Sequence, residues 1–429
     1  MKDIEAMLSW ANQDALSKPY EKFYRELLKQ AEERAKTVTD DRFICYPTQV
    51  NIAAQVLNSM TNSYATCFWL PPGNGKSFVI LIACWYLRNK DEDKRIYVVL
   101  PTDYLKTQME KFSNAAFAWT KPPEFITHAE LPSNLYENAL YFVDEVVHCW
   151  TTMPITTHAL TKKVTGFWAL GRNPYKAVFC SGIYSQNSAA FVRDCYVSSR
   201  VLDFPRHSQR VTGLPKNPDF TVICKPNLHD QCSALLAKAN ELQNDDIPVI
   251  IFGLKVDKTI DYGFPETTQV DYVDSDLSAA SVSSNTYADN RRIILCQPRY
   301  YVGCDFRFPK DATVLILAKE DRPHYEKLMQ MFGRGARSMA SFYGYLFMIG
   351  AKGTGSSHKD SYLQYVGPDF KGLAKNVRLA HYVAKLPDTA GDQARLAIKT
   401  KLKHPVQFHK DFIKTVPQEV MDKFREGHY

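Results

Sequence analysis

The amino-acid sequence predicts an α/β protein with two lobes, each built on a parallel sheet covered by helices. Short apolar runs alternate with helical stretches from Phe43 to about Arg210, and this alternation is typical of parallel sheets with both faces buried. A stretch rich in proline, residues 204–220, interrupts the alternation as a hinge would, and the pattern then restarts. A glycine-rich loop also separates the first apolar run from an apolar helix.

The first lobe is expected over residues 40–210, after a helical N-terminal extension over residues 1–39. Apolar runs of strand length predict its sheet, at residues 65–70, 95–100, 139–143 and 176–180.

The second lobe is expected over residues 211–350, with a helix over residues 228–243. Its strands are expected at residues 221–224, 248–253, 292–296 and 313–318. The polar stretch 274–290, rich in Ser, Asp and Asn, is interpreted as a surface loop or a disordered excursion. Residues 351–429 are expected to form a basic, mostly helical C-terminal extension.

Composition narrows the class of protein. With 429 residues, 45% of them hydrophobic and 23% charged, the chain suits two or three soluble domains. The run from Phe78 to Leu87 has about ten apolar residues, whereas a membrane span needs about 20, so a buried helix is expected there. No secretory signal is visible at the N-terminus. Ten cysteines without a CxxC pair argue against a zinc site and for an intracellular, cytoplasmic location.

The positive charge is concentrated near the end of the sequence. The formal net charge is +7, and residues 351–429 contain 14 Lys and Arg against 8 Asp and Glu. Such a distribution indicates a polyanionic partner, although a solvated helical face is the alternative.

A phosphate-binding loop is predicted at residues 70–77, Leu-Pro-Pro-Gly-Asn-Gly-Lys-Ser, between a strand and an apolar helix. Glycines let backbone N–H groups face phosphates, and the helix N-terminus adds partial positive charge. Lys76 is expected to reach the β- and γ-phosphates, and Ser77 to ligate Mg²⁺. Leu70 stands where the full GxxxxGK[ST] pattern has its first glycine. The residues expected to bind nucleotide here are Gly73, Asn74, Gly75, Lys76 and Ser77.

Two adjacent carboxylates follow the predicted strand 139–143. Asp144 is expected to hold Mg²⁺, and Glu145 to polarise the attacking water. An Asp-Glu pair after a strand is common by itself. Together with the phosphate loop, it indicates nucleotide hydrolysis.

A third pattern is Gln330-Met-Phe-Gly-Arg334-Gly-Ala-Arg337, in which the two arginines are expected on one helical face. Supplied from the second lobe, Arg334 and Arg337 would act with Gln330 on the γ-phosphate as arginine fingers when the lobes close. For the arginines alone, a surface pair on a helix is the alternative.

Together these residues resemble superfamily two helicases of the DExH type, over roughly Phe43 to Gly350. The resemblance implies two tandem RecA-like domains, a nucleotide site in the cleft between them, and ATP or another NTP with Mg²⁺. Residues 46–49 resemble the element whose glutamine, Gln49, reads the adenine. Gly303-Cys-Asp305 resembles the fifth motif, whose aspartate meets the ribose or a coupling network. Residues 101–108 and 249–252 resemble a phosphate-contacting motif and the fourth-motif strand.

Two departures from the family pattern concern the coupling of hydrolysis to movement. Val147 occupies the fourth position of the Asp-Glu box, with His148 next to it; His148 is either a substitute or a structural histidine. Ser181-Gly182-Ile183 stands where the family has Ser-Ala-Thr, so the threonine hydroxyl is missing. Translocation without strand separation therefore stays open.

We expect an ATP-dependent helicase or translocase that acts on RNA, in the host cytoplasm if the chain is viral, as its small size and divergent motifs suggest. A DNA motor is one alternative. A non-hydrolysing nucleic-acid-binding scaffold with a degenerate ATPase core is another. A P-loop kinase is disfavoured, because it would leave the second lobe without a role.

The C-terminal extension is expected to lie over the nucleic-acid channel and bind single strands. Cations would neutralise phosphates while aromatic rings stack on bases. The lysines singled out are Lys399, Lys401, Lys403 and Lys410, and the aromatic residues are Tyr362, Tyr365, Phe370, Tyr382, Phe408 and Phe412. The alternative is that these rings pack the extension onto the second lobe.

Overall fold

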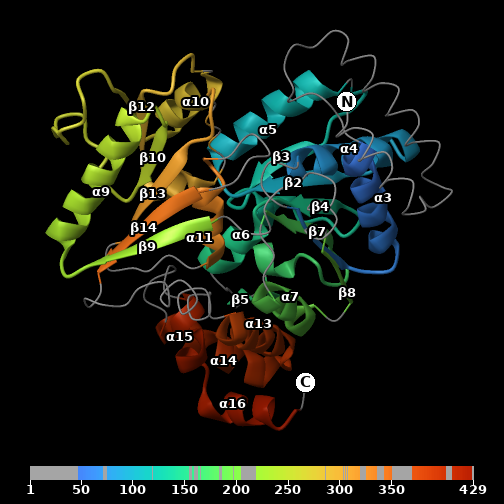
Figure 1. Cartoon of the computed structure of the whole chain (residues 1–429). Helices are drawn as coiled ribbons and strands as arrows, with labels where there is room; N and C mark the ends of the chain where they lie inside the picture. The colour runs from blue at the N-terminus through green and yellow to red at the C-terminus, as the bar shows by residue number, and fades with distance from the viewer. Residues whose placement is uncertain are drawn as a thin grey trace. The chain divides into compact units, whose positions relative to one another are not determined.

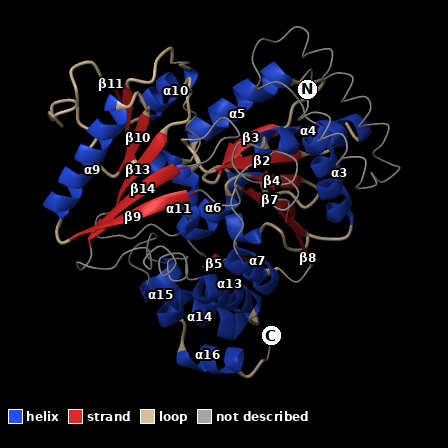
Figure 2. Cartoon of the chain, in the orientation of Figure 1, coloured by secondary structure: helices blue, strands red, loops and turns tan. Residues whose placement is uncertain are grey.

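The structure is a computed structural model of the chain (Figures 1 and 2). It describes residues 47–70, 75–117, 119–153, 157–158, 163–164, 166–182, 186–196, 198–203, 219–285, 287–302, 304, 306, 308–318, 325–335, 343–349, 370–401 and 408–427. The expected N-terminal extension, residues 1–39, lies outside these residues.

Contacts divide the chain into two compact units. The first comprises Met1–Trp69, Gly75–Asp203 and Pro368–Tyr429, and the second comprises Leu70–Asn74 and Phe204–Gly367. The C-terminal segment from Pro368 thus belongs to the same unit as the phosphate-loop helix. The sequence had suggested a separate extension over residues 351–429.

The first unit is built on a six-stranded parallel sheet with strand order β3-β2-β4-β7-β1-β8. Its strands are β1 (Ala65–Trp69), β2 (Ile96–Leu100), β3 (Glu124–Thr127), β4 (Leu140–Val143), β7 (Lys176–Ser181) and β8 (Ser199–Asp203). The four inner strands are the four predicted apolar runs, and nearly all of their residues are buried. The two edge strands escaped prediction because they are partly polar.

Helices precede or connect the strands of the first unit, since neighbouring parallel strands need crossover connections. They are α3 (Pro47–Thr61), α4 (Lys76–Lys90), α5 (Asp103–Ala116), α6 (Val146–Thr152) and α7 (Gln186–Cys195). A short antiparallel pair, β5 (Thr157–His158) and β6 (Lys163–Val164), follows α6. The expected buried helix is α4, whose residues from Phe78 to Tyr86 are all buried.

The second unit repeats the parallel design, with strand order β11-β12-β10-β13-β14-β9. Its strands are β9 (Asp219–Lys225), β10 (Val249–Phe252), β11 (Gln269–Val273), β12 (Arg292–Cys296), β13 (Thr313–Ala318) and β14 (Tyr343–Ile349). Its helices are α9 (Leu228–Asn244), α10 (Asp276–Ser284) and α11 (Tyr325–Phe332). The prediction of two parallel sheets in tandem is therefore confirmed.

The interpretation of residues 274–290 as a loop is wrong, because α10 lies within them. The Ser275 side chain accepts a hydrogen bond from the Ser278 N–H, and the Ser278 side chain accepts one from the Ser275 N–H, which forms a capping box. Ala279 and Val282 are buried. A segment rich in serine suggests turns or helix caps. Here Ser275 caps a helix, and the buried side chains of Ala279 and Val282 hold that helix in place.

Four further helices end the described chain: α13 (Phe370–Lys385), α14 (Asp388–Lys401), α15 (Phe408–Thr415) and α16 (Gln418–Arg425). Figure 1 shows α13 beside α7 and β5. Alternate strand residues such as Trp69, Tyr141 and Phe179 share one apolar cluster with Phe370 and Val377 of α13. The C-terminal helices therefore complete the core of the first unit. No described helix is long and apolar enough to cross a bilayer.

Candidate nucleotide-binding site

The predicted site residues of the first unit lie at the carboxyl ends of its parallel strands. The end of β1 leads to the phosphate loop, β4 leads directly to Asp144 and Glu145, and Ser181 is the last residue of β7. Trp69 pairs with Ser181, and Val143 pairs with Phe179, so these strand ends share one edge of the sheet. Open α/β sheets bind ligands at this edge.

Gly75 ends the phosphate loop and precedes α4 in a left-handed conformation, with φ of 74°. A Cβ at this position would lie 2.1 Å from Nε2 of Gln49, so only glycine fits. The buried Gln49 side chain, from α3, therefore lies against the end of the loop. Gly73 and Asn74 lie outside the described residues.

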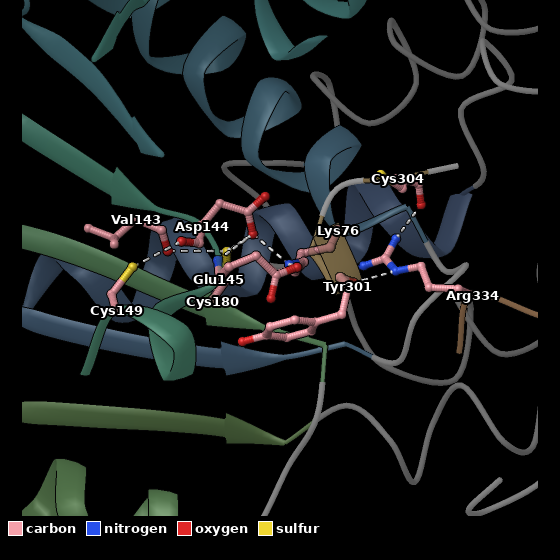
Figure 3. Close-up of polar contacts among 9 residues, drawn as sticks. All are labelled: Lys76, Val143, Asp144, Glu145, Cys149, Cys180, Tyr301, Cys304 and Arg334. Atoms are coloured by element: carbon pink, nitrogen blue, oxygen red, sulfur yellow. Dashed lines mark hydrogen bonds and ion pairs between the residues drawn. The ribbon is translucent and has the colours of Figure 1, made fainter. Parts of the chain in front are cut away.

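Lys76 bridges the two carboxylates (Figure 3). Its Nζ lies 2.5 Å from Oδ1 of Asp144 and 2.6 Å from Oε1 of Glu145. Burial alone would lower the pKa of Lys76, but the two carboxylates outweigh burial and hold that pKa above its usual value. The Lys76 side chain therefore stays protonated, and a lysine needs this positive charge to bind phosphate.

Glu145 has an unusual backbone for a residue with a side chain. Its φ of 51° lies in the left-handed region, at the start of α6. The Glu145 N–H donates to Oδ1 of Asp144 over 2.8 Å. Strained backbone of this kind concentrates at functional sites, where the surrounding structure holds it in place.

Two buried thiols surround Asp144, and sequence reasoning missed both. The Cys180 thiol donates to Oδ1 of Asp144 over 3.3 Å, and the Cys149 thiol donates to the Asp144 carbonyl oxygen over 3.7 Å. Burial raises the pKa of both groups, so they remain neutral donors. Cys180 directly precedes Ser181, and Cys149 lies one helical turn after Glu145. This proximity to predicted site residues was the only feature of the sequence that could have indicated the two thiols.

The donor set suits Mg²⁺. The ion is bound in proteins by one or two carboxylates together with substrate phosphates and water. Asp144 and Glu145 already converge on one cationic group, Lys76, and Ser77 follows that lysine in the first turn of α4. Within the described part of the chain, no group of three or more His, Cys, Asp or Glu side chains could hold a metal by itself.

In the two segments that depart from the family pattern, Val147 and Ser181 are buried. Val147 is 1% exposed, and Ser181 is fully buried, with no hydrogen-bond partner for its hydroxyl among the described residues. Burial, together with the smaller effect of the nearby His148 on α6, lowers the pKa of His128 to about 4. Ile183 lies outside the described residues.

In the second unit, Gln330 is buried on α11, and Arg334 lies in the turn that follows this helix. The expectation that Arg334 lies on a helical face is therefore wrong. After this turn, Gly335 packs closely against the residue that precedes β13: its carbonyl accepts from the Ala312 N–H over 2.8 Å, and a Cβ would meet the Ala312 oxygen at 2.2 Å.

Arg334 is held by main-chain carbonyls of its own unit (Figure 3). Its Nε donates to the Tyr301 oxygen over 2.7 Å, and Nη1 donates to the Cys304 oxygen over 3.0 Å. Arg334 is thus tied to the segment that resembles the fifth motif. Gly303, Asp305 and Arg337 lie outside the described residues.

The chain is similar to a known protein family and to several solved structures. Residues 42–138 match the model of a family described as the res subunit of type III restriction enzymes. No curated protein sequence matches the chain. The chain is similar to Mss116p, lacking its NTE and C-tail, bound to ssRNA and AMP-PNP: the TM-score is 0.52 and the identity 12%, over 94% of this chain and 95% of that one.

Two further structures are similar. The DEAD-box helicase Mss116 bound to ssRNA and UDP-BeF gives a TM-score of 0.50 at 13% identity, over 91% and 94% of the two chains. Dbp5 of S. cerevisiae bound to RNA and ADP BeF3 gives 0.51 at 12% identity, over 82% and 97%. The chain therefore shares the fold of these helicase structures, which has two RecA-like lobes.

Proposed function

We propose that this protein is an NTP-driven motor of the helicase type, which hydrolyses ATP or another nucleoside triphosphate to move along or remodel a nucleic acid. The observation that carries the proposal is the bridge from Lys76 to Asp144 and Glu145 at the carboxyl edge of a parallel sheet. The fold shared with nucleotide-bound helicases supports it.

The start of α4 is the proposed phosphate site. Lys76 would exchange its two carboxylate partners for the β- and γ-phosphates, and Ser77 and Asp144 would hold Mg²⁺. The ion, when bound, neutralises charge that develops on the phosphate oxygens. Gln49 lies against Gly75 and is the proposed contact to the base.

Glu145 is the proposed group that polarises the attacking water. In the structure, Oε1 of its carboxylate accepts a hydrogen bond from Lys76. When Lys76 engages phosphates, Oε1 no longer accepts from Lys76 and can accept from water instead. A single lysine thus links nucleotide binding to activation of the base.

Arg334 and Arg337, with Gln330, are proposed to stabilise the transition state from the second unit. A guanidinium group has five N–H donors. Within the described residues, the bonds from Arg334 to Tyr301 and Cys304 use two of them, which leaves three for phosphate oxygens.

RNA is the substrate that we favour, because the Mss116 and Dbp5 structures contain RNA. DNA is the alternative. The test is ATP hydrolysis by the full chain alone, with single-stranded RNA and with single-stranded DNA of matched sequence, and Lys76→Ala serves as the control for contaminating activity. We expect hydrolysis that depends on Lys76 and rises most with RNA. A larger rise with DNA would reverse the substrate assignment. Hydrolysis no higher than in Lys76→Ala under all three conditions would overturn the motor in favour of a scaffold.

A further inference from the structure

One face of α13 carries a row of cations. Phe370, Leu373 and Val377 bury the other face in the core of the first unit. The exposed positions that carry positive charge are Lys371, Lys375, Arg378 and Lys385. Their spacings of four, three and seven residues put them on one line along the helix, because an α-helix has 3.6 residues per turn. We call these four residues the α13 stripe.

Within the described residues, the cations of the α13 stripe have no direct carboxylate partners. The sequence of α13 contains no Asp or Glu. Among the described residues, no ion pair joins a stripe residue to a carboxylate, whereas other cations on the surface are paired, such as Lys238 with Glu241 and Arg425 with Asp422. Like charges at i,i+3 and i,i+4 destabilise a helix slightly, so solvation alone gives no reason for this arrangement.

The dimensions of the stripe suit an extended polyanion. At 1.5 Å rise per residue, the stripe is about 21 Å long, with steps of about 6, 4.5 and 10.5 Å. A nucleic-acid strand carries a phosphate about every 3.4 Å in B-form geometry. The stripe could therefore neutralise several phosphates of one strand that runs along the helix.

Base stacking does not accompany these charges. Three of the aromatic residues expected to stack, Phe370, Tyr382 and Phe412, are buried in the core of the first unit, so that expectation is wrong for them. They pack against the first unit, and the alternative had placed them on the second. Tyr362, Tyr365 and the side chain of Phe408 lie outside the described residues.

We propose that the α13 stripe is a binding surface for the phosphate backbone of single-stranded nucleic acid, located on the first unit outside the nucleotide site. It reads charge and not sequence, and it needs no nucleotide to bind. It therefore goes beyond the proposed motor activity, and binding alone can test it.

The experiment measures binding of a fluorescent single-stranded oligonucleotide to the full chain over a series of salt concentrations, without nucleotide. The variant replaces Lys371, Lys375, Arg378 and Lys385 by Gln. Each lost phosphate contact reduces the slope of log affinity against log salt by about 0.7, so we expect a fall of up to about 3. Deleting residues from 352 onward would be a poorer test, since it would also remove the buried face of α13 from the core.

The matched control compares two double variants with the same change in charge. Lys371→Gln with Lys375→Gln should lower the slope, and Lys423→Gln with Arg425→Gln, on α16, should not. Lys371→Arg with Lys375→Arg should retain binding. A folded quadruple variant with an unchanged slope overturns the proposal. So does an equal loss in the α16 control, or a stripe variant that loses binding to anionic vesicles but not to the oligonucleotide.

Discussion

Lys76 stands between two carboxylates that follow one another in the chain, and this places one positive charge against two negative ones. All three side chains are largely buried, so their interaction is screened less than it would be at the surface. The remaining negative charge makes the site a good one for a divalent cation. The three side chains bind one another in the absence of nucleotide, and the same three are proposed to bind the metal–nucleotide complex.

Changing Glu145 should separate nucleotide binding from hydrolysis. In Glu145→Gln we expect nucleotide to stay bound while turnover falls by about 10²–10⁴, since the amide cannot act as a base. Lys76→Ala should lose both, because the site loses its ammonium group. Nucleotide binding by equilibrium fluorescence and turnover by phosphate release measure the two effects. Wild-type turnover in Glu145→Gln would remove Glu145 from its proposed role.

Changing Cys180 should affect the response to Mg²⁺ more than the binding of nucleic acid. The thiol orients the Asp144 carboxylate, and loss of such a partner typically weakens metal binding by 10–100-fold. A thiol is a weak donor, so in Cys180→Ala we expect about a tenfold rise in the Mg²⁺ concentration that gives half-maximal activity.

Cys180→Ser keeps a donor and should restore most of the response to Mg²⁺. Cys195→Ala is the matched control, because it also removes a buried thiol from the first unit. If the Mg²⁺ response is equal in Cys180→Ala and Cys195→Ala, the bond to Asp144 has no role in orientation.

At the scale of the element, burial decides which parts can be predicted. The inner strands β1, β2, β4 and β7 are continuous apolar runs because both of their faces are covered, so the sequence reveals them. The edge strand β8, Ser-Arg-Val-Leu-Asp, lacks this signal. The serine-rich helix α10 was misread because its cap and its two buried residues matter only in a folded context.

The residues of the candidate site also divide into those that the sequence predicts and those that only the folded sheet brings together. Lys76, Asp144 and Glu145 were predictable because each belongs to a local pattern after a strand. The bond from Cys180 to Asp144 was not, because it depends on β7 pairing with β4, and strand order is a property of the whole sheet. Viral origin and the RNA preference stay predictions.

Arg334, in the turn after α11, has two proposed roles, one in catalysis and one in stability, and two measurements on one variant can separate them. Arg334→Ala should lower turnover by about 10³ or more if the guanidinium stabilises transition-state charge. It should also destabilise the second unit, since two bonds to carbonyls are lost. Single-turnover hydrolysis and denaturant unfolding measure the two effects. Loss of stability without a selective loss of turnover in the folded protein would make Arg334 structural only.

At the scale of the whole molecule, the stability of the first unit should depend on α13. The Phe370 ring lies 6.2 Å from that of Trp150 and 5.3 Å from that of Phe191. Phe370→Ala should lower the free energy of unfolding of this unit by about 3–5 kcal/mol. All six tryptophans lie at or before residue 168, so tryptophan fluorescence reports on the first unit selectively.

The control for this prediction is Leu396→Ala in α14, where the side chain is 63% exposed. It should change stability by no more than about 0.5 kcal/mol. If Phe370→Ala behaves like this control, the C-terminal helices contribute little to the stability of the first unit.

Because the first unit is completed by α13 to α16, its parts are made at different times on the ribosome. The surface around Trp150 emerges early, and its covering helix follows only after Phe204–Gly367 have been translated. At 5–20 residues per second, this delay is about 10–30 s. During that interval the nascent chain presents an uncovered aromatic surface, while the second unit is still being synthesised. Synthesis rate and chaperone supply should therefore govern the yield of this protein more than they would if its two lobes followed one another along the chain.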